Sequence, residues 1–283
     1  MTSKAVAASS VVGTARYIDR AAILRGMGAV ETGESVGLGR DVKVERAVEV
    51  RDAHGVKLDA QGFKRGRFAF SAERMVVDIH GTANTHIDGL NHISVDGCFH
   101  NGFAPDDTTK MGVAVWSKEG LVTRAILADI TRLRGEPWVT AERPVTAAEV
   151  EACLAEANQH VLPGDALLLY MGRDRYEAAG HTYTEFALDQ TSRPGAAGDV
   201  GDWVVDHRIA MLCWDFLDAS NVSPEASVHA RLVTHGLLLI DNCAVERAIE
   251  PFSRKAKPEG LICISPPALH GATGMLVNPL LIV

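Results

Sequence analysis

Residues 80–92 read His-Gly-Thr-Ala-Asn-Thr-His-Ile-Asp-Gly-Leu-Asn-His, which places three histidines and one carboxylate in a short stretch. Neutral imidazole and carboxylate are ligands that Zn²⁺, Mn²⁺ and Fe²⁺ accept. His86 and Asp88 are two residues apart, so in an extended segment both side chains point to the same side and can reach one ion. His92 follows four residues later, where a turn could bring it over the same place as a base or a further ligand. The stretch therefore predicts a metal site.

A chance occurrence is the alternative. A single histidine in a strand is more often a surface residue or a satisfied core residue, and a bare His-x-Asp pair is common. The fuller pattern has another histidine upstream and Gly81 and Gly89 on either side, where glycine permits turns. This combination favours a built site.

The motif resembles the signature of the metal-dependent cyclase/hydrolase family, which includes bacterial kynurenine formamidase and isatin hydrolase. The core motif of that family reads His-x-Gly-Thr-His-x-Asp-Ala-Pro-x-His, and residues 85–92 match its second half. Residues 162–169 resemble the family's Pro-Gly-Asp turn into a buried strand, residues 227–241 its second metal-binding segment, and residues 271–283 its C-terminal strand. The resemblance runs from about residue 15 to the end of the chain.

The resemblance implies a set of site residues. Metal ligands are expected at His86, Asp88, His229 and Asp241, with His92 as the catalytic proton donor and acceptor. Asp241 stands where the family usually has glutamate. It also follows four apolar residues, so it should emerge from the core, where a buried carboxylate needs a partner such as a cation.

The second departure from the family pattern is Thr82, which stands where the family has its first metal-binding histidine. A threonine hydroxyl is not deprotonated at neutral pH and is a poor ligand for these ions. His80 lies two residues earlier on the same strand face and could substitute. We therefore expect one divalent ion per chain, Zn²⁺ or Mn²⁺, rather than two.

These assignments predict a metal-dependent amidohydrolase. The ion would activate water to attack a non-peptide amide C–N bond, in a formamide or small lactam, and His92 would relay the proton to the leaving group. Two alternatives stay open. One is a ring-closing cyclase or dehydratase of a biosynthetic pathway, and the other is a non-catalytic family member that has lost its metal.

The resemblance also implies an α/β architecture, the swivelling β/β/α fold with a mixed sheet or barrel-like core flanked by helices. Homodimers or larger homo-oligomers with sites near the interface are expected. Hydrophobic periodicity and capping signals predict an alternation of both element types. Helices are predicted at residues 19–27, 146–160, 202–208 and 229–235, and strands at 42–51, 75–79, 120–130, 166–170, 209–213, 237–240, 261–264 and 276–283.

Composition agrees with a globular enzyme acting on a small molecule. The chain has 283 residues, of which 47% are hydrophobic, enough for a large core. No linker or composition shift divides it, so we expect a single cyclase/hydrolase-like domain over residues 1–283, with 1–12 as a loose tail. The net charge of −8 argues against nucleic acid and anionic membranes as partners.

Localisation in the cytoplasm is predicted from three absences in the sequence. There is no apolar run of about 18 residues, no secretory signal, and no Cys-x-x-Cys among the five scattered cysteines. Weaker site candidates are His100 and Asn84 as pocket residues, Cys98 as a nucleophile, and Arg193 as a contact for a substrate anion. For Arg193, an exposed loop position is the commoner role.

Overall fold

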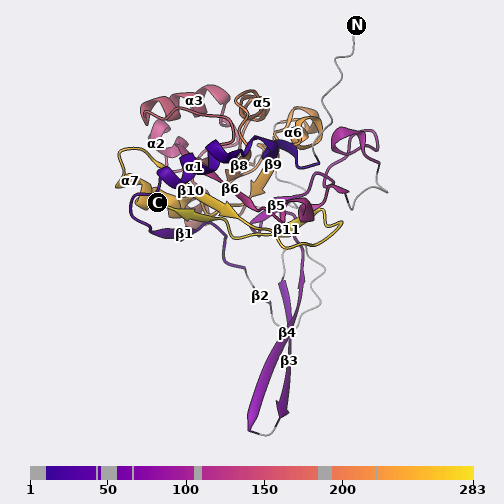
Figure 1. Cartoon of the computed structure of the whole chain (residues 1–283). Coiled ribbons are helices and arrows are strands. Elements are labelled where there is room, and N and C mark those ends of the chain that lie inside the picture. Colours follow the sequence, from indigo (N-terminus) through magenta and orange to yellow (C-terminus); the bar gives the residue numbers. More distant parts are fainter. Residues whose placement is uncertain are drawn as a thin grey trace.

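A mixed sheet of nine strands forms the centre of the part of the chain that the structure describes (Figure 1). The structure is a computed structural model that describes residues 11–42, 44–45, 56–65, 67–104, 110–183, 193–220 and 222–283. The strand order is β1 (Ser35–Gly37), β12 (Leu280–Ile282), β10 (Glu259–Ile264), β6 (Leu121–Asp129), β7 (Ala166–Tyr170), β8 (Met211–Trp214), β9 (Leu238–Asp241), β5 (His86–Asp88) and β11 (Gly274–Leu276).

The four central strands, β6 to β9, run parallel, and the strands outside them pair antiparallel. Every residue of β7, β8 and β9 is buried, as expected for parallel strands covered on both faces. Their apolar sequences, Ala-Leu-Leu-Leu-Tyr in β7 for example, are the reason that these strands form the core. The predicted mixed α/β class, with helices flanking a mixed sheet, is confirmed.

Helices α1, α3, α5 and α6 cover one face of the sheet (Figure 1). The helix bounds are α1 (Arg20–Gly28), α2 (Ile130–Arg134), α3 (Ala147–Glu156), α4 (Arg173–Ala178), α5 (Gly198–Asp206), α6 (Ala230–His235) and α7 (Glu246–Ser253). Short 3₁₀ turns lie at η1 (Gly13–Tyr17), η2 (His100–Gly102), η4 (Val113–Trp116) and η5 (Pro224–Ala226). The predicted helices are present with ends shifted by a few residues.

Local capping explains two of these helix starts. The Asp19 carboxylate accepts a hydrogen bond from the Ala22 N–H, 2.8 Å away, and so caps α1. At α3 the Glu149 carboxylate reaches back to the Thr146 N–H at 3.1 Å, as the predicted capping box requires.

A second, three-stranded sheet projects away from the body of the molecule (Figure 1). It consists of β2 (Val44–Glu45), β3 (Val56–Arg65) and β4 (Phe68–Val77), and β3 and β4 form a long antiparallel hairpin. Of the predicted strand at 42–51, β2 is the part that is observed, and residues 43 and 46–51 lie outside the described residues. The predicted strand at 75–79 is the end of the longer β4.

The predicted strand at 276–283 is wrong as one continuous element. It is two strands, β11 and β12, which lie far apart in the order of the sheet. Pro279 stands between them, and a proline has no N–H to continue a ladder of hydrogen bonds. Its carbonyl instead accepts a hydrogen bond from the Leu38 N–H at 2.8 Å.

The predicted single domain stays a prediction, and residues 1–10 of the predicted tail lie outside the described residues. Val12 is not loose, because its carbonyl accepts a hydrogen bond from Trp116 Nε1 at 3.1 Å.

Within the described ranges, no helix combines the length and the apolar character that a membrane crossing requires.

Candidate metal centre

The candidate site lies at the edge of the sheet where the parallel strands β8 and β9 end. Asp241 is the last residue of β9, and it pairs in register with His86, the first residue of the antiparallel strand β5. This is the edge at which open α/β sheets commonly bind ligands.

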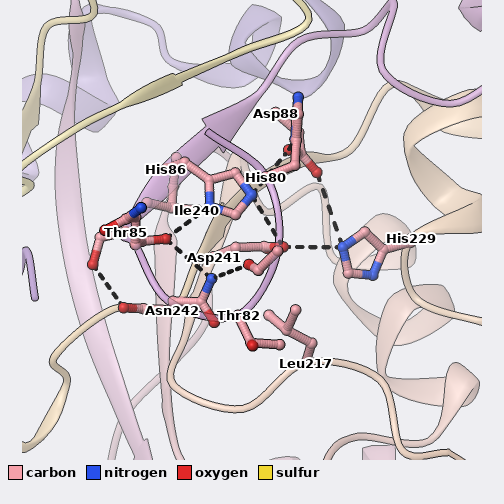
Figure 2. Close-up of polar contacts among 12 residues, drawn as sticks. His80, Thr82, Thr85, His86, Asp88, Leu217, His229, Ile240, Asp241 and Asn242 are labelled. Carbon is pink, nitrogen blue, oxygen red and sulfur yellow. Dashed lines mark hydrogen bonds and ion pairs between the residues drawn. The ribbon is translucent and has the colours of Figure 1, made fainter. Parts of the chain in front are cut away.

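The structure brings together all four residues to which the resemblance assigns the metal (Figure 2). His86 Nε2 lies 3.4 Å from Asp88 Oδ1 and 3.8 Å from Asp241 Oδ2. His229 Nε2 lies 3.1 Å from Asp241 Oδ2 and 3.9 Å from Asp88 Oδ2. Two imidazole nitrogens and two carboxylates thus converge on one point.

Asp88 is the residue whose environment most strongly indicates a cation. Its side chain is 1% exposed, and within the described part of the chain neither carboxylate oxygen has a hydrogen-bond partner. Burial alone would raise the pKa of Asp88, but His80 together with the imidazoles of His86, His92 and His229 lowers it far below the usual range. A buried, charged carboxylate without hydrogen bonds is costly unless a cation is bound. The residues present therefore fit a divalent ion.

The ring of His86 is held with one nitrogen free for a ligand role. Its Nδ1 lies 2.9 Å from the carbonyl oxygen of Asn84, to which it can donate a hydrogen bond. That bond leaves Nε2 as the acceptor nitrogen facing the site. The side chain of Asn242, next to Asp241, fixes this loop by donating to the carbonyls of Gly81 and Asn84 at 2.7 and 3.1 Å.

His229, the N-cap of α6, lies between two carboxylates. Its Nδ1 is 2.5 Å from Oδ2 of Asp218, a residue that the sequence analysis missed. Burial alone would lower the pKa of His229, but Asp241 and Asp218 raise it well above its usual value. Asp218 is the kind of outer carboxylate that orients a metal-binding histidine.

Asp218 could have been found from the sequence by the reasoning applied to Asp241. It follows the apolar strand β8, after residues 215–217, and so lies near the same carboxyl edge of the parallel sheet. In the structure its Oδ1 accepts a hydrogen bond from the Val228 N–H at 2.6 Å, which fixes the start of the segment that carries His229.

Asp241 is positioned from its other side by Trp214, whose indole Nε1 donates to Asp241 Oδ1 at 2.6 Å. Its Oδ2 is left to face His86 and His229.

His80 and His92 form the outer part of the site. Their rings stack with centroids 3.7 Å apart and an interplanar angle of 3°. His80 Nδ1 lies 3.2 Å from Asp88 Oδ1. Burial lowers the pKa of His92 and outweighs the opposite effect of Asp88, so His92 is neutral at pH 7 and can accept a proton.

Among the residues that the structure describes, two groups of three donors could therefore hold an ion, and both groups include Asp88. One consists of His86, Asp88 and Asp241, the other of His80, Asp88 and His92, and in each group the donor atoms lie within 4.8 Å of one another. His92, predicted as the base, is thus also placed as a possible ligand, and His80 is placed to substitute for the missing histidine at 82.

The weaker sequence candidates fall mostly outside the site. The Thr82 hydroxyl donates to the carbonyl of Tyr183 at 3.2 Å, and the Asn84 amide donates to the carbonyl of Asp78 at 3.2 Å. His100 lies apart from the centre, with Nδ1 2.9 Å from the Val233 carbonyl oxygen. Cys98 is exposed with a free thiol.

A cavity of about 360 Å³ opens onto the candidate centre. Its walls include His80, His86, His92, His229 and Asp241, and also Arg193 and Leu217. A larger cavity of about 660 Å³ lies beside it, lined by Thr82, Asn84, Arg40 and Arg173 among others, but it contains neither group of metal donors.

The chain matches a protein-family model. The model of the Cyclase family, described as "Putative cyclase", matches residues 36–220. No curated protein matches the chain.

Several solved structures share the fold. A crystal structure of a novel cyclase superposes with a TM-score of 0.81 at 18% identity, covering 97% of this chain and 95% of the other. An isatin hydrolase bound to the product analogue thioisatinate gives 0.60 at 16% identity, covering 94% and 99%. Isatin hydrolase A from Labrenzia aggregata, bound to benzyl benzoate, gives 0.61 at 14% identity, covering 91% and 95%. At these identities the likeness establishes the fold.

Proposed function

Because this chain belongs to the Cyclase family, we propose that it is a metal-dependent hydrolase that cleaves the C–N bond of a non-peptide amide, in a formamide or a small lactam. The observation that carries the proposal is the buried Asp88 carboxylate, which has no hydrogen-bond partner among the described residues. It lies 3.2, 3.4 and 3.9 Å from imidazole nitrogens of His80, His86 and His229, three histidines that line the cavity.

One Zn²⁺ or Mn²⁺ ion would be held by His86, Asp88, His229 and Asp241. Both metals accept mixed nitrogen and oxygen ligands. When bound, the ion supplies Lewis acidity, which activates water and polarises a carbonyl group. Asp218 and the Asn84 carbonyl hold the two histidine rings in orientation from behind.

His92 would carry the proton. It lines the cavity, and its lowered pKa leaves it neutral and able to take a proton from the attacking water. The proton would then pass to the leaving nitrogen. Stacking against His80 holds the His92 ring at the cavity wall.

The cavity volume suits a small molecule, because ligand pockets typically enclose about 300 to 1,000 Å³. The isatin hydrolases that share this fold support hydrolysis as the reaction class, and the description of the family as putative cyclases supports the alternative of ring closure. Ring closure by loss of water is the runner-up reaction, since the same ion and the same histidine would serve it. The homo-oligomer expected from the resemblance remains part of the proposal.

Metal content and product analysis test the function. Protein purified without chelator or metal-affinity tag is measured by elemental mass spectrometry and then assayed on formamides and lactams. About one equivalent of zinc or manganese with release of amine and acid supports the hydrolase. Two equivalents would mean that His80 completes a second site, and a product formed by loss of water would favour the cyclase. No metal, even after zinc and manganese are offered back, would favour the non-catalytic reading.

A further inference from the structure

The cavity at the candidate metal centre carries an unusual charge distribution. Its polar walls are made mostly of carboxylates and imidazoles. Of the described residues that line it, Arg193 alone carries a permanent positive charge. Arg193 is therefore the group in these walls best suited to attract an anion.

The backbone of Arg193 is firmly attached to the segment that follows β8. The Arg193 N–H donates to Ser220 Oγ at 2.6 Å, and the Arg193 carbonyl accepts from the Ser220 N–H at 3.1 Å. Pro194 comes next and restricts the backbone of Arg193 to extended conformations. Because Asp218 lies in the same segment, Arg193 is fixed relative to the centre.

In the described part of the chain, Nε is the one nitrogen of the Arg193 guanidinium group that has a hydrogen-bond partner. Arg193 Nε donates a long hydrogen bond of 3.3 Å to the carbonyl oxygen of Asp218. In the ranges that the structure describes, no carboxylate lies within ion-pair distance of Arg193, and neither of its Nη atoms has a hydrogen-bond partner. The nearby carboxylate of Asp218 is already occupied, by the Val228 N–H and by His229. Both Nη groups of Arg193, with four N–H donors, are therefore left for a ligand.

Such an arrangement suits a carboxylate. The planar guanidinium places two N–H groups so that they can bind both oxygens of one carboxylate, which a lysine ammonium cannot do. We propose that Arg193 is the specificity-determining residue of this cavity and that the preferred substrates are anionic amides, which carry a carboxylate besides the amide to be cleaved. This inference rests on the proposed hydrolase function and deepens it.

A matched pair of compounds tests the assignment. Formanilide and 2-formamidobenzoate carry the same formamide and differ by one carboxylate. With the metal-loaded protein, kcat/KM should be at least tenfold higher for 2-formamidobenzoate. Arg193→Gln should lower kcat/KM for that compound by about 10- to 100-fold, mainly through KM, since a hydrogen-bonded charge contact is lost. The value for formanilide should change less than twofold. Arg193→Lys should restore only part of the loss, and Arg132→Gln, an exposed arginine on α2, is the control expected to match the wild type.

A binding measurement separates this inference from the proposed function. Calorimetric titration with 2-aminobenzoate and with aniline needs no turnover. A Kd for 2-aminobenzoate that is at least tenfold weaker in Arg193→Gln, with aniline unaffected, supports the assignment even if neither formamide is hydrolysed. Equal affinity of the wild type and Arg193→Gln for 2-aminobenzoate overturns it. So does an equal kcat/KM for the two formamides, and in that case the hydrolase itself still stands.

Discussion

Asp218 holds the ring of His229 from behind: its Oδ2 lies 2.5 Å from His229 Nδ1, while Nε2 of the same ring faces Asp241 Oδ2 at 3.1 Å. The contact fixes which nitrogen points into the site. It also ties the start of α6 to the segment after β8, because Asp218 Oδ1 accepts from the Val228 N–H.

Asp218→Asn is therefore expected to weaken metal binding. An outer carboxylate of this kind typically contributes 10- to 100-fold in metal affinity. The amide oxygen of asparagine can still accept a hydrogen bond from Nδ1–H, but it brings no negative charge to stabilise the ring. Competition titration of zinc against a chelator measures the change. Asp202→Asn, which alters a surface ion pair with Arg231, is the control and should leave the affinity unchanged. An unaltered zinc affinity in Asp218→Asn would contradict the role assigned to it.

Asp88→Asn should abolish metal binding altogether, because both groups of donors include Asp88. His80→Ala should remove at most the ion of the outer group and leave the ion held by His86 and Asp241. Elemental mass spectrometry of the purified variants gives the stoichiometry. Stoichiometric metal in a folded Asp88→Asn protein would refute the assignment of Asp88 as a ligand.

His92→Ala should lower turnover by about 10²- to 10⁴-fold, the usual contribution of a positioned acid–base group. The metal content should stay as in the wild type if His92 moves protons and does not serve as a ligand. Measuring kcat and metal content on the same preparation separates the two roles. Loss of an equivalent of metal along with activity would make His92 a ligand, and unchanged turnover would remove it from the mechanism.

Glu149→Gln should destabilise the fold at neutral pH by about 1–2 kcal/mol, because it removes the charge that pairs with Arg134, while the amide oxygen can still accept from the Thr146 N–H. Burial alone would raise the pKa of Glu149, but Arg134 and the Thr146 N–H lower it below its usual value. A lowered pKa in the folded state means that the carboxylate stabilises the fold above the unfolded pKa, about 4.3, and that this contribution is lost as the pH falls through the folded pKa.

Urea unfolding between pH 7 and pH 3.5 checks this prediction, and the difference between wild type and Glu149→Gln should shrink towards zero in acid. Glu151→Gln on the exposed face of the same helix is the control, expected to change the free energy of unfolding by less than about 0.5 kcal/mol. A difference that is constant with pH would exclude the carboxylate as its source.

The sequence predicts the central strands well because each is a short apolar run bounded by turn residues, as at β7 and β9. The sequence could not predict that β11 lies at the end of the sheet beside β5, because the order of strands depends on contacts between distant segments and not on local periodicity. Pro279 was the available sign that residues 276–283 do not form one strand.

For the site, local pattern predicted His86 and Asp88 as ligands, while His229 and Asp241 were predicted mainly from the resemblance. Nothing in the local sequence indicates that β5 lies beside β9 with His86 opposite Asp241. Asp218 was missed although it follows an apolar strand, because three residues separate it from β8. His80 was weighed only as a substitute for a ligand at 82, and its stacking on His92 depends on a turn that periodicity does not describe.

Both hydrogen-bonded neighbours of β5 come later in the chain, since β9 and β11 follow it in sequence. Asp241 is about 150 residues beyond Asp88, and a ribosome adding about 5–20 residues per second needs roughly 8–30 s to reach it. Throughout that interval the nascent chain holds half of a ligand set, on a strand with no partner. A centre built from all four residues is therefore completed only late in synthesis, whereas the group of His80, Asp88 and His92 is complete as soon as residue 92 has been added.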